Sequence, residues 1–378
     1  MKAIVHLGMP KTGTTTLQSW LYLNRKALAV RGIGYDRMAY RRRDQRSAHT
    51  ELSFCARDRV GLLQMDRGLR IKHQIFDLGQ QRSFVMKYEP VFARSLRRMA
   101  APQVILSSEY LGAGLQSEEE AKALDDWLSQ FFDDIRYVIY FRRQEDLVLS
   151  SYQQRLKSGH VGDFDSFLHK HAVHNYAQIA DRWVSAVGRD KLDVRLFERD
   201  WLVDADIIAD FSNAIGLDEI LDRPASQNES LSLAAQELLH AVNRKIPHKS
   251  EDGKRHNPVY AKVRDHIVDM ADSGPARTLT GEQIDQVRSL NQRHNEDLRA
   301  AFFPQREELF APRPAKGSDP EAIDHKEQVA RAAAELANRM AIELKYGKKL
   351  VRAPDASPQP SKPRRFDLWS RLVSRNET

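Results

Sequence analysis

The sequence HLGMPKTGTTTLQ, residues 6–18, decides the fold. It begins inside AIVHL, a short apolar run typical of a buried parallel strand, and it leads into a stretch with Leu17, Leu21 and Leu28 at near-helical spacing, which Gly32 ends. In the order strand, glycine loop, helix, the backbone N–H groups of PKTGTTT form a concave nest for an anion at the start of the helix. The stretch therefore predicts a phosphate-type binding loop, in preference to a Gly-Thr pair that only starts a helix.

The rest of the main region alternates apolar runs with helical patterns. Three further buried strands are predicted, over 102–110, 135–143 and 191–200. Helices are predicted over 117–132, 145–157, 164–188 and 204–217. Strands that alternate with helices indicate a mostly parallel sheet covered on both faces. The predicted fold class is α/β, a three-layer P-loop-NTPase-like fold with a central parallel sheet flanked by helices.

Composition shifts suggest how the chain is divided. Residues 1–310 are expected to form the main domain, in which 33–101 is a helical insertion that covers the active face. Residues 311–350 are interpreted as a linker and a C-terminal helix, and 351–378 as a disordered basic tail. The end of this tail, RRFDLWSRLVSR, combines apolar and basic residues in a pattern typical of peripheral membrane contact or partner docking, and packing back onto the domain's own surface is the alternative.

The composition narrows the class of protein. The chain has 378 residues, a formal charge of +7 and one cysteine. The charge favours an anionic ligand or partner. The single cysteine excludes an intramolecular disulfide and a cysteine-rich zinc site. Without a signal-peptide pattern or a long apolar run, the expected location is cytoplasmic.

The lysine position separates the loop from the common nucleotide-triphosphate loop. A Walker A loop places lysine after its second glycine, whereas Thr14 follows Gly13 here and the lysine is Lys11. A kinase or ATPase also needs an aspartate at a strand end to hold Mg²⁺, and the apolar strands end in Ser-Glu or in arginines. The sequence thus favours a phosphate ligand that needs no metal, and a group such as an activated sulfate fits this requirement.

Two motifs resemble the sulfotransferases that use 3′-phosphoadenosine 5′-phosphosulfate (PAPS). GMPKTGTTTLQ resembles their 5′-phosphosulfate loop, with its Lys-x-Gly-Thr-Thr core between the first strand and the first helix. VIYFRRQEDLVLSSYQQ resembles their second hallmark, a strand that ends in arginine and is followed eight residues later by a serine at a helix start. The resemblance covers roughly residues 2–310 and implies PAPS as the co-substrate, with no metal.

The resemblance also implies roles for individual residues. Arg142 and Ser150 would grip the 3′-phosphate of PAPS, with Arg143 as the competing arginine and an Arg142–Asp146 ion pair as the purely structural alternative. The loop residues would hold the 5′-phosphosulfate, and they are Lys11, Thr12, Gly13, Thr14, Thr15 and Thr16. Lys11 would also offset the charge that develops on the leaving phosphate oxygen.

Sulfuryl transfer needs a base for the proton of the acceptor hydroxyl. The resemblance implies Glu109, at the end of the strand between the two motifs, and a carboxylate buried there would have a raised pKa. An ion pair with a neighbouring arginine is its structural alternative. His49 is the second candidate, and His6 is interpreted as a core or loop-orienting residue.

The acceptor carries no motif of its own. A basic cluster could receive an acidic glycan or could simply be a solvated face, and it consists of Arg37, Arg41, Arg42, Arg43 and Arg46. A second basic stretch spans 248–258, and neither patch accompanies a nucleic-acid motif. The prediction is a sulfotransferase acting on a hydroxyl, most plausibly of a carbohydrate or glycolipid. A P-loop kinase of a small hydroxylated substrate and a non-catalytic nucleotide-binding module are the alternatives.

Overall fold

The centre of the molecule is a parallel five-stranded sheet. The computed structural model describes residues 1–36, 38, 48–218, 221–224, 231–249, 257–270, 275–311 and 325–346. Its strands lie in the order β2-β3-β1-β4-β5 and are β1 (Lys2–Leu7), β2 (Ile33–Gly34), β3 (Gln103–Ser108), β4 (Asp134–Arg142) and β5 (Leu192–Phe197). The predicted α/β fold class is confirmed. The sequence missed β2, because two residues are too few to produce a periodic pattern.

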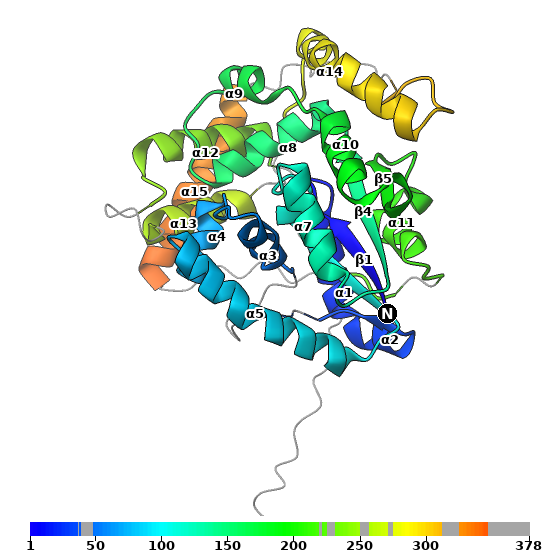
Figure 1. Ribbon diagram of the computed structural model, residues 1–378. Coiled ribbons are helices and arrows are strands. Elements are labelled where there is room, and N and C mark those ends of the chain that lie inside the picture. The colour runs from blue at the N-terminus through cyan, green and yellow to red at the C-terminus, as the bar shows by residue number, and fades with distance from the viewer. Residues whose placement is uncertain are drawn as a thin grey trace, which may run out of the picture.

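Alternating side chains along the strands give the sheet two apolar faces. In β4, Tyr137, Ile139 and Phe141 pack into one cluster and Val138 and Tyr140 into another. The first cluster is covered by α3 (Leu52–Arg59), α5 (Leu78–Met99), α7 (Glu118–Leu128) and α10 (Tyr176–Val187). The second is covered by α1 (Thr14–Leu23), α2 (Arg25–Val30) and α11 (Ile207–Ala214) (Figure 1). Helices on both faces bury the sheet, as its parallel strands require.

A third apolar cluster lies beyond the carboxyl ends of the strands. Figure 1 shows α12, α13 and α15 grouped beside α8. The helices that contribute residues to this cluster are α8 (Gln144–Lys157), α9 (Phe164–His171), α12 (Leu233–Lys245), α13 (Pro258–Asp269), α14 (Gly281–Phe302) and α15 (His325–Tyr346). Leu336 and Met340 of α15 pack into this cluster. The helix expected near the C-terminus therefore lies against the rest of the chain.

The predicted single helix over 164–188 is two helices. A break after α9 is followed by Asn175, whose side chain accepts a hydrogen bond from the backbone N–H of Gln178 at 2.9 Å and begins α10. Asparagine at this position satisfies an N–H group that a new helix leaves unpaired. The correction matters for function, because the chain between the helices passes close to the loop of residues 8–13.

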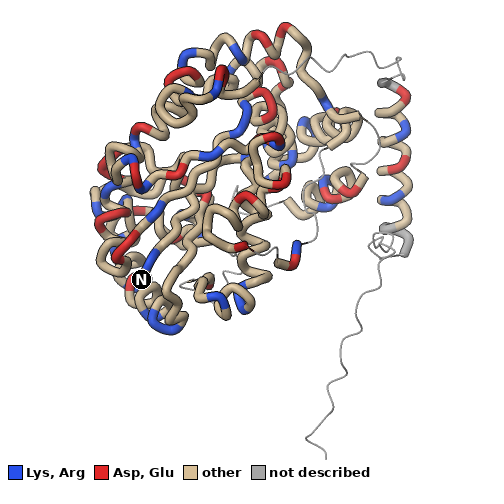
Figure 2. The backbone as a smooth tube through the Cα atoms, turned by 90° about the vertical axis from the view of Figure 1, so that its right-hand side faces the viewer, with Lys and Arg blue, Asp and Glu red and all other residues tan. Residues whose placement is uncertain are grey.

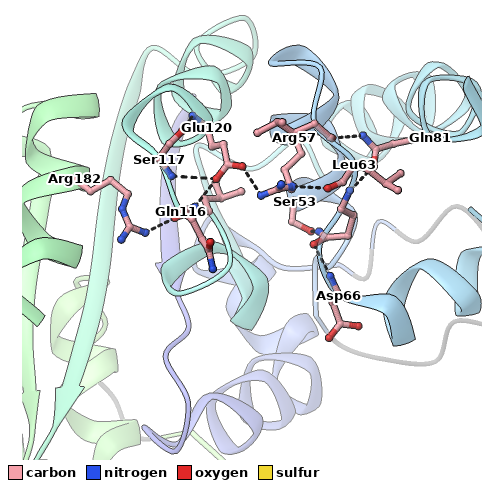
Figure 3. Close-up of polar contacts among 12 residues, drawn as sticks. Ser53, Arg57, Leu63, Asp66, Gln81, Gln116, Ser117, Glu120 and Arg182 are labelled. Atoms are coloured by element: carbon pink, nitrogen blue, oxygen red, sulfur yellow. Dashed lines mark hydrogen bonds and ion pairs between the residues drawn. The ribbon is translucent and has the colours of Figure 1, made fainter. Parts of the chain in front are cut away.

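Helices of the 33–101 region are tied to α7 by buried polar contacts. The region contains α3, α4 (Arg67–His73) and α5. Figure 3 shows Arg57 of α3 between Leu63 and Glu120: its Nε donates to the Leu63 carbonyl at 2.9 Å, and its Nη1 contacts the Glu120 carboxylate. Glu120 also completes a capping box with Ser117 at the start of α7. These contacts fix the described part of the region to the sheet domain.

Charged residues are distributed over the whole described surface. Figure 2 shows Lys and Arg interspersed with Asp and Glu, for example along α15, where Arg331 pairs with Glu327 and Arg339 with Glu335. Exposed pairs of this kind stabilise a helix only slightly. The positive net charge alone therefore does not mark an anion site, which has to be located from local geometry.

Candidate active site

The loop between β1 and α1 is held in an unusual backbone conformation. Lys11 has φ 63° and Gly13 has φ 76°, both in the left-handed region. A non-glycine residue in this region stores strain, which is commonly found at functional sites. The hydroxyls of Thr12 and Thr14 both donate to the carbonyl of Met9, at 2.9 and 3.3 Å. The threonines therefore close the loop around its own backbone.

The start of α1 is available to an anion. Gly13 occupies the N-cap position, no side chain caps the helix, and its first turn contains no acidic residue. The first N–H groups of a helix lack partners within the helix, and they carry the positive end of its dipole. Thr15 is exposed and Thr16 half-buried, and neither hydroxyl has a hydrogen-bond partner in the described part of the chain. This arrangement suits a phosphate or sulfate group.

Cationic side chains gather around the same loop. The Nζ of Lys11 donates to Oε1 of Gln154 on α8 at 3.1 Å. Burial lowers the pKa of Lys11, as do the neighbouring Lys157 and Arg142, whereas the carboxylate of Glu109 raises it. Burial also lowers the pKa of Lys157. Like charges held together at a loop are costly, and an anion bound among them relieves that cost.

Arg142 connects the loop to a second pocket. Its Nη1 donates to the carbonyl of Lys11 at 2.8 Å. Arg142 and Ser150 both line a pocket of about 350 Å³, so the structure brings together the two residues of the second motif. Ser150 lies in the middle of α8 rather than at its start, because the helix begins immediately after β4. Its hydroxyl donates to the carbonyl of Asp146 at 2.8 Å.

Sequence reasoning missed Arg277, which lines the same pocket. Its Nε donates to Oε1 of Gln236 at 3.3 Å, and its guanidinium lies 5.0 Å from the ring centroid of Phe164. No motif or spacing marks this arginine in the sequence, since only the packing of the C-terminal helices brings it to α8. The charged and hydroxyl residues on the wall of the pocket are four arginines, two hydroxyls and two carboxylates: Arg142, Arg143, Arg277, Arg288, Ser150, Thr278, Glu145 and Asp146.

Arg143, the other arginine considered for the 3′-phosphate, is held by contacts within the fold. Its side chain is 3% exposed and pairs with the carboxylate of Glu198, which is also buried. Its guanidinium also lies 5.5 Å from the ring centroid of Phe310. A buried arginine that pairs with a carboxylate already has a partner for its charge, and a ligand phosphate would have to compete with that carboxylate. Of the two arginines, Arg142 is the one in contact with the loop.

Glu109 lies beside the loop and is exposed. The sequence predicted a buried carboxylate at this position, and that prediction is wrong. The backbone N–H of Gly8 donates to the carbonyl of Ser108 at 2.9 Å, and a Cβ at Gly8 would lie 3.0 Å from the Cα of Glu109. β3 ends at Ser108, whose side chain caps the short helix α6 (Glu109–Gly112), so Glu109 projects from the edge of the sheet and is exposed. Within the described ranges its carboxylate forms no hydrogen bond or ion pair, so no arginine occupies it.

The two histidines are held inside the fold. Nδ1 of His49 accepts a hydrogen bond from the backbone N–H of Ser107 at 2.9 Å, and Nε2 donates to the carbonyl of Asp36 at 2.7 Å. Burial lowers the pKa of His49 to about 4 and that of His6 also to about 4. His6 contacts the Ser107 hydroxyl at 2.9 Å. Both ring nitrogens of His49 are therefore engaged by backbone groups, and neither faces the loop as a base.

Several predicted features lie outside the described residues. They are the arginine cluster at 37–46, most of the basic stretch 248–258, the linker after residue 311 and the tail 351–378. Among the residues that the structure describes, no group of three or more His, Cys, Asp or Glu could hold a metal ion. In the same part of the chain, no helix combines the length and apolar character required to cross a membrane. Metal independence and the cytoplasmic location remain predictions.

Comparison with known proteins adds one distant likeness. The chain is similar to a solved structure described as the sulfotransferase domain from the curacin biosynthetic pathway, at 10% sequence identity and a TM-score of 0.31, over 88% of this chain and 96% of that chain. No family model matches the sequence, and no curated protein matches it. So low a similarity assigns no activity, and the function has to be argued from the site itself.

Proposed function

We propose that the protein transfers the sulfuryl group of PAPS to a hydroxyl of an acceptor, a carbohydrate or a glycolipid. The observation that carries the proposal is the position of Arg142, which contacts the loop at Lys11 and also lines the pocket with Ser150. PAPS has phosphate groups on two sides of its ribose, and therefore needs two anion sites that lie near each other. The loop and this pocket form such a pair.

The loop supports the 5′ side of the donor. The uncapped start of α1 supplies N–H groups, the hydroxyls of Thr15 and Thr16 remain available, and Lys11 supplies a positive charge. The pocket of about 350 Å³ beside α8 supports the 3′-phosphate, through Arg142, Ser150 and Arg277 on its wall. An arginine can bind a phosphate through two parallel N–H groups, which fixes orientation as well as affinity.

The chemical step is a displacement at sulfur. A bond forms between the acceptor oxygen and sulfur while the bond between sulfur and the 5′-phosphate oxygen breaks. Glu109, exposed beside Gly8, takes the proton of the acceptor hydroxyl, and Lys11 offsets the negative charge that develops on the leaving phosphate oxygen. Positioning by the rigid loop supplies the in-line approach. Each charge change has a side chain within the site to receive it.

Donor binding is the first test of the proposal. We expect 3′,5′-adenosine bisphosphate to bind and to raise the melting temperature in the presence of a metal chelator, because the two sites need only protein groups. Calorimetric titration measures the affinity, and ATP with Mg²⁺ is titrated in parallel. Tighter binding of ATP with Mg²⁺ would favour the kinase alternative. Bisphosphate binding without turnover of PAPS on any acceptor of a glycan and alcohol panel would favour a non-catalytic module.

Substitution of Arg142 tests the assignment at one residue. Arg142→Ala is expected to weaken bisphosphate binding by about 1.5 to 3 kcal/mol, the range for a hydrogen bond to a charged group. Arg155→Ala is the matched control, because Arg155 is an exposed arginine in the last turn of α8, the helix that follows β4. Equal affinities of the Arg142→Ala variant and the unaltered protein would contradict the assignment.

A further inference from the structure

A different pocket, of about 360 Å³, lies between the loop and the start of α10. Met9, Pro10 and Thr12 of the loop line it, as do His174, Gln178 and Arg182 from α10 and the chain before it. The break between α9 and α10 forms this wall. Pro10 and Thr12 flank Lys11 in sequence, and Arg142 lines both pockets. A ligand in this pocket therefore contacts the same loop that is proposed to hold the sulfuryl group.

The Lys, Arg, Asp and Glu side chains that line this pocket are all positively charged. Two arginines, Arg142 and Arg182, line it, whereas none of its lining residues is Asp or Glu. Apolar side chains of Met9, Val173 and Ile179 complete part of the wall. Ligand pockets commonly combine an apolar lining with a few polar groups that fix the orientation of the ligand. Here the fixed groups favour an anion.

Arg182 carries a positive charge that the described part of the protein leaves without a carboxylate in ion-pair contact. Its Nη1 donates to the backbone carbonyl of Leu115 (Figure 3). The nearby carboxylate of Glu120 is already engaged: Oε1 contacts Arg57, and Oε2 accepts hydrogen bonds from backbone N–H groups at the start of α7. In the described residues, no Asp or Glu pairs with Arg182.

This lack of a partner has an energetic consequence. Arg182 is half-buried, and burial lowers the pKa of its guanidinium, an effect that Glu120 partly offsets. A partly buried charge is stabilised when an opposite charge with good hydrogen-bond geometry reaches it. Since no carboxylate of the described residues is in ion-pair contact with Arg182, an anionic ligand that enters the pocket adds to the partial compensation that Glu120 gives.

We infer that this pocket binds the acceptor and that the acceptor carries a carboxylate, as a uronic acid sugar does, which Arg182 recognises. The inference rests on the proposed function and narrows its substrate class. The apolar side chains suit the non-polar face of a sugar ring, and the loop at Pro10 places a ring hydroxyl beside the donor. The acceptor site is thereby assigned to α10 rather than to the 33–101 region.

A matched pair of sugars tests the inference. Methyl β-D-glucuronide and methyl β-D-glucoside, which differ in one carboxylate, are titrated calorimetrically with and without saturating 3′,5′-adenosine bisphosphate. We expect the glucuronide to bind about tenfold to hundredfold more tightly, as a charged hydrogen bond predicts, and added salt to reduce the difference. Arg182→Gln should abolish the preference and raise KM for the glucuronide. Arg189→Gln should preserve it, because exposed Arg189 also donates to a backbone carbonyl but lies outside the pocket.

The possible failures are distinguishable. No preference for the glucuronide, including no binding of either sugar, overturns the inference, as does a preference that survives Arg182→Gln. Bisphosphate binding and turnover of PAPS with neutral acceptors report on the proposed function separately. If these persist while the preference is absent, only the carboxylate assignment is wrong. If both fail, the proposed function itself is wrong.

Discussion

Individual residues divide into those that face the loop and those that stabilise the fold near it. The carboxylate of Glu109 interacts electrostatically with Lys11, and Arg142 donates a hydrogen bond to the Lys11 carbonyl. In contrast, His49 is held by hydrogen bonds to the backbone, and Arg143 is held by an ion pair. The difference arises from partners: both ring nitrogens of His49 are hydrogen-bonded to backbone groups, and Arg143 pairs with the buried carboxylate of Glu198. Burial and existing hydrogen-bond or ion-pair partners thus distinguish candidate site residues that residue type alone does not distinguish.

Substitution of Glu109 tests the proposed base. Glu109→Gln should lower turnover by about a hundredfold or more, because the amide cannot accept the acceptor proton, and it should leave bisphosphate affinity unchanged. Turnover with PAPS and calorimetric titration measure the two effects. Glu118→Gln is the control, since Glu118 is an exposed carboxylate in the first turn of α7. Full activity of Glu109→Gln, with loss of activity in a folded His49→Gln variant, would transfer the role to His49.

Close contact between elements gives the site its shape. A Cβ at Gly8 would lie 2.8 Å from Cγ2 of Thr14 and 3.0 Å from the Cα of Glu109, and a Cβ at Gly112 would lie 2.9 Å from Sδ of Met9. All three distances are shorter than a van der Waals contact allows. The loop and α6 can therefore approach each other only because glycine occupies these two positions. This approach determines the separation between the proposed base and Lys11.

Gly8→Ala is expected to push the loop away from Glu109. The backbone of Glu109 cannot yield as a flexible side chain could, so we expect a stability loss of about 1 to 3 kcal/mol and a lower turnover. Urea unfolding and the PAPS assay measure these changes. Gly281→Ala is the control, because no atom lies within 4 Å of its added Cβ at the start of α14, and alanine there should be neutral or stabilising. Equal effects of the two substitutions would refute the role assigned to close packing.

At the scale of the whole molecule, Arg142 at the carboxyl end of β4 lines two pockets. One pocket lies toward α8 and residues 276–279, and the other toward α10. The switch in strand order around β1, with β3 on one side and β4 on the other, brings Glu109 and Arg142 to the two flanks of the loop. Ligands of open α/β sheets bind at such a crevice, at the carboxyl ends of the strands.

Buried histidines make the stability of the whole molecule depend on pH. Their pKa values of about 4 in the folded protein, for both His6 and His49, lie below the ordinary value of 6.5. The unfolded chain therefore binds more protons, and stability should be fully present above about pH 6.5 and fall as pH decreases toward 4, by up to about 1.4 kcal/mol per pH unit for each histidine.

Urea unfolding at several pH values measures this dependence. His49→Gln should reduce the slope, because it removes one of the buried imidazoles whose pKa is lowered by burial. His169→Gln should leave the slope unchanged, since His169 is exposed on α9. A slope that is the same in His49→Gln as in the unaltered protein would contradict the prediction.

The sequence by itself determined the four longer strands, the loop and the positions of the two motifs, because these depend on short-range patterns: apolar periodicity, helix caps and the spacing of glycine, lysine and threonine. It missed the two-residue strand β2 and the break at Asn175, where local signals are too short or are outweighed by capping. Only the tertiary structure decided that Glu109 is exposed, that His49 is occupied and that Arg182 and Arg277 reach the pockets. Burial and the identity of a partner depend on residues far away in the sequence, and no local pattern encodes them.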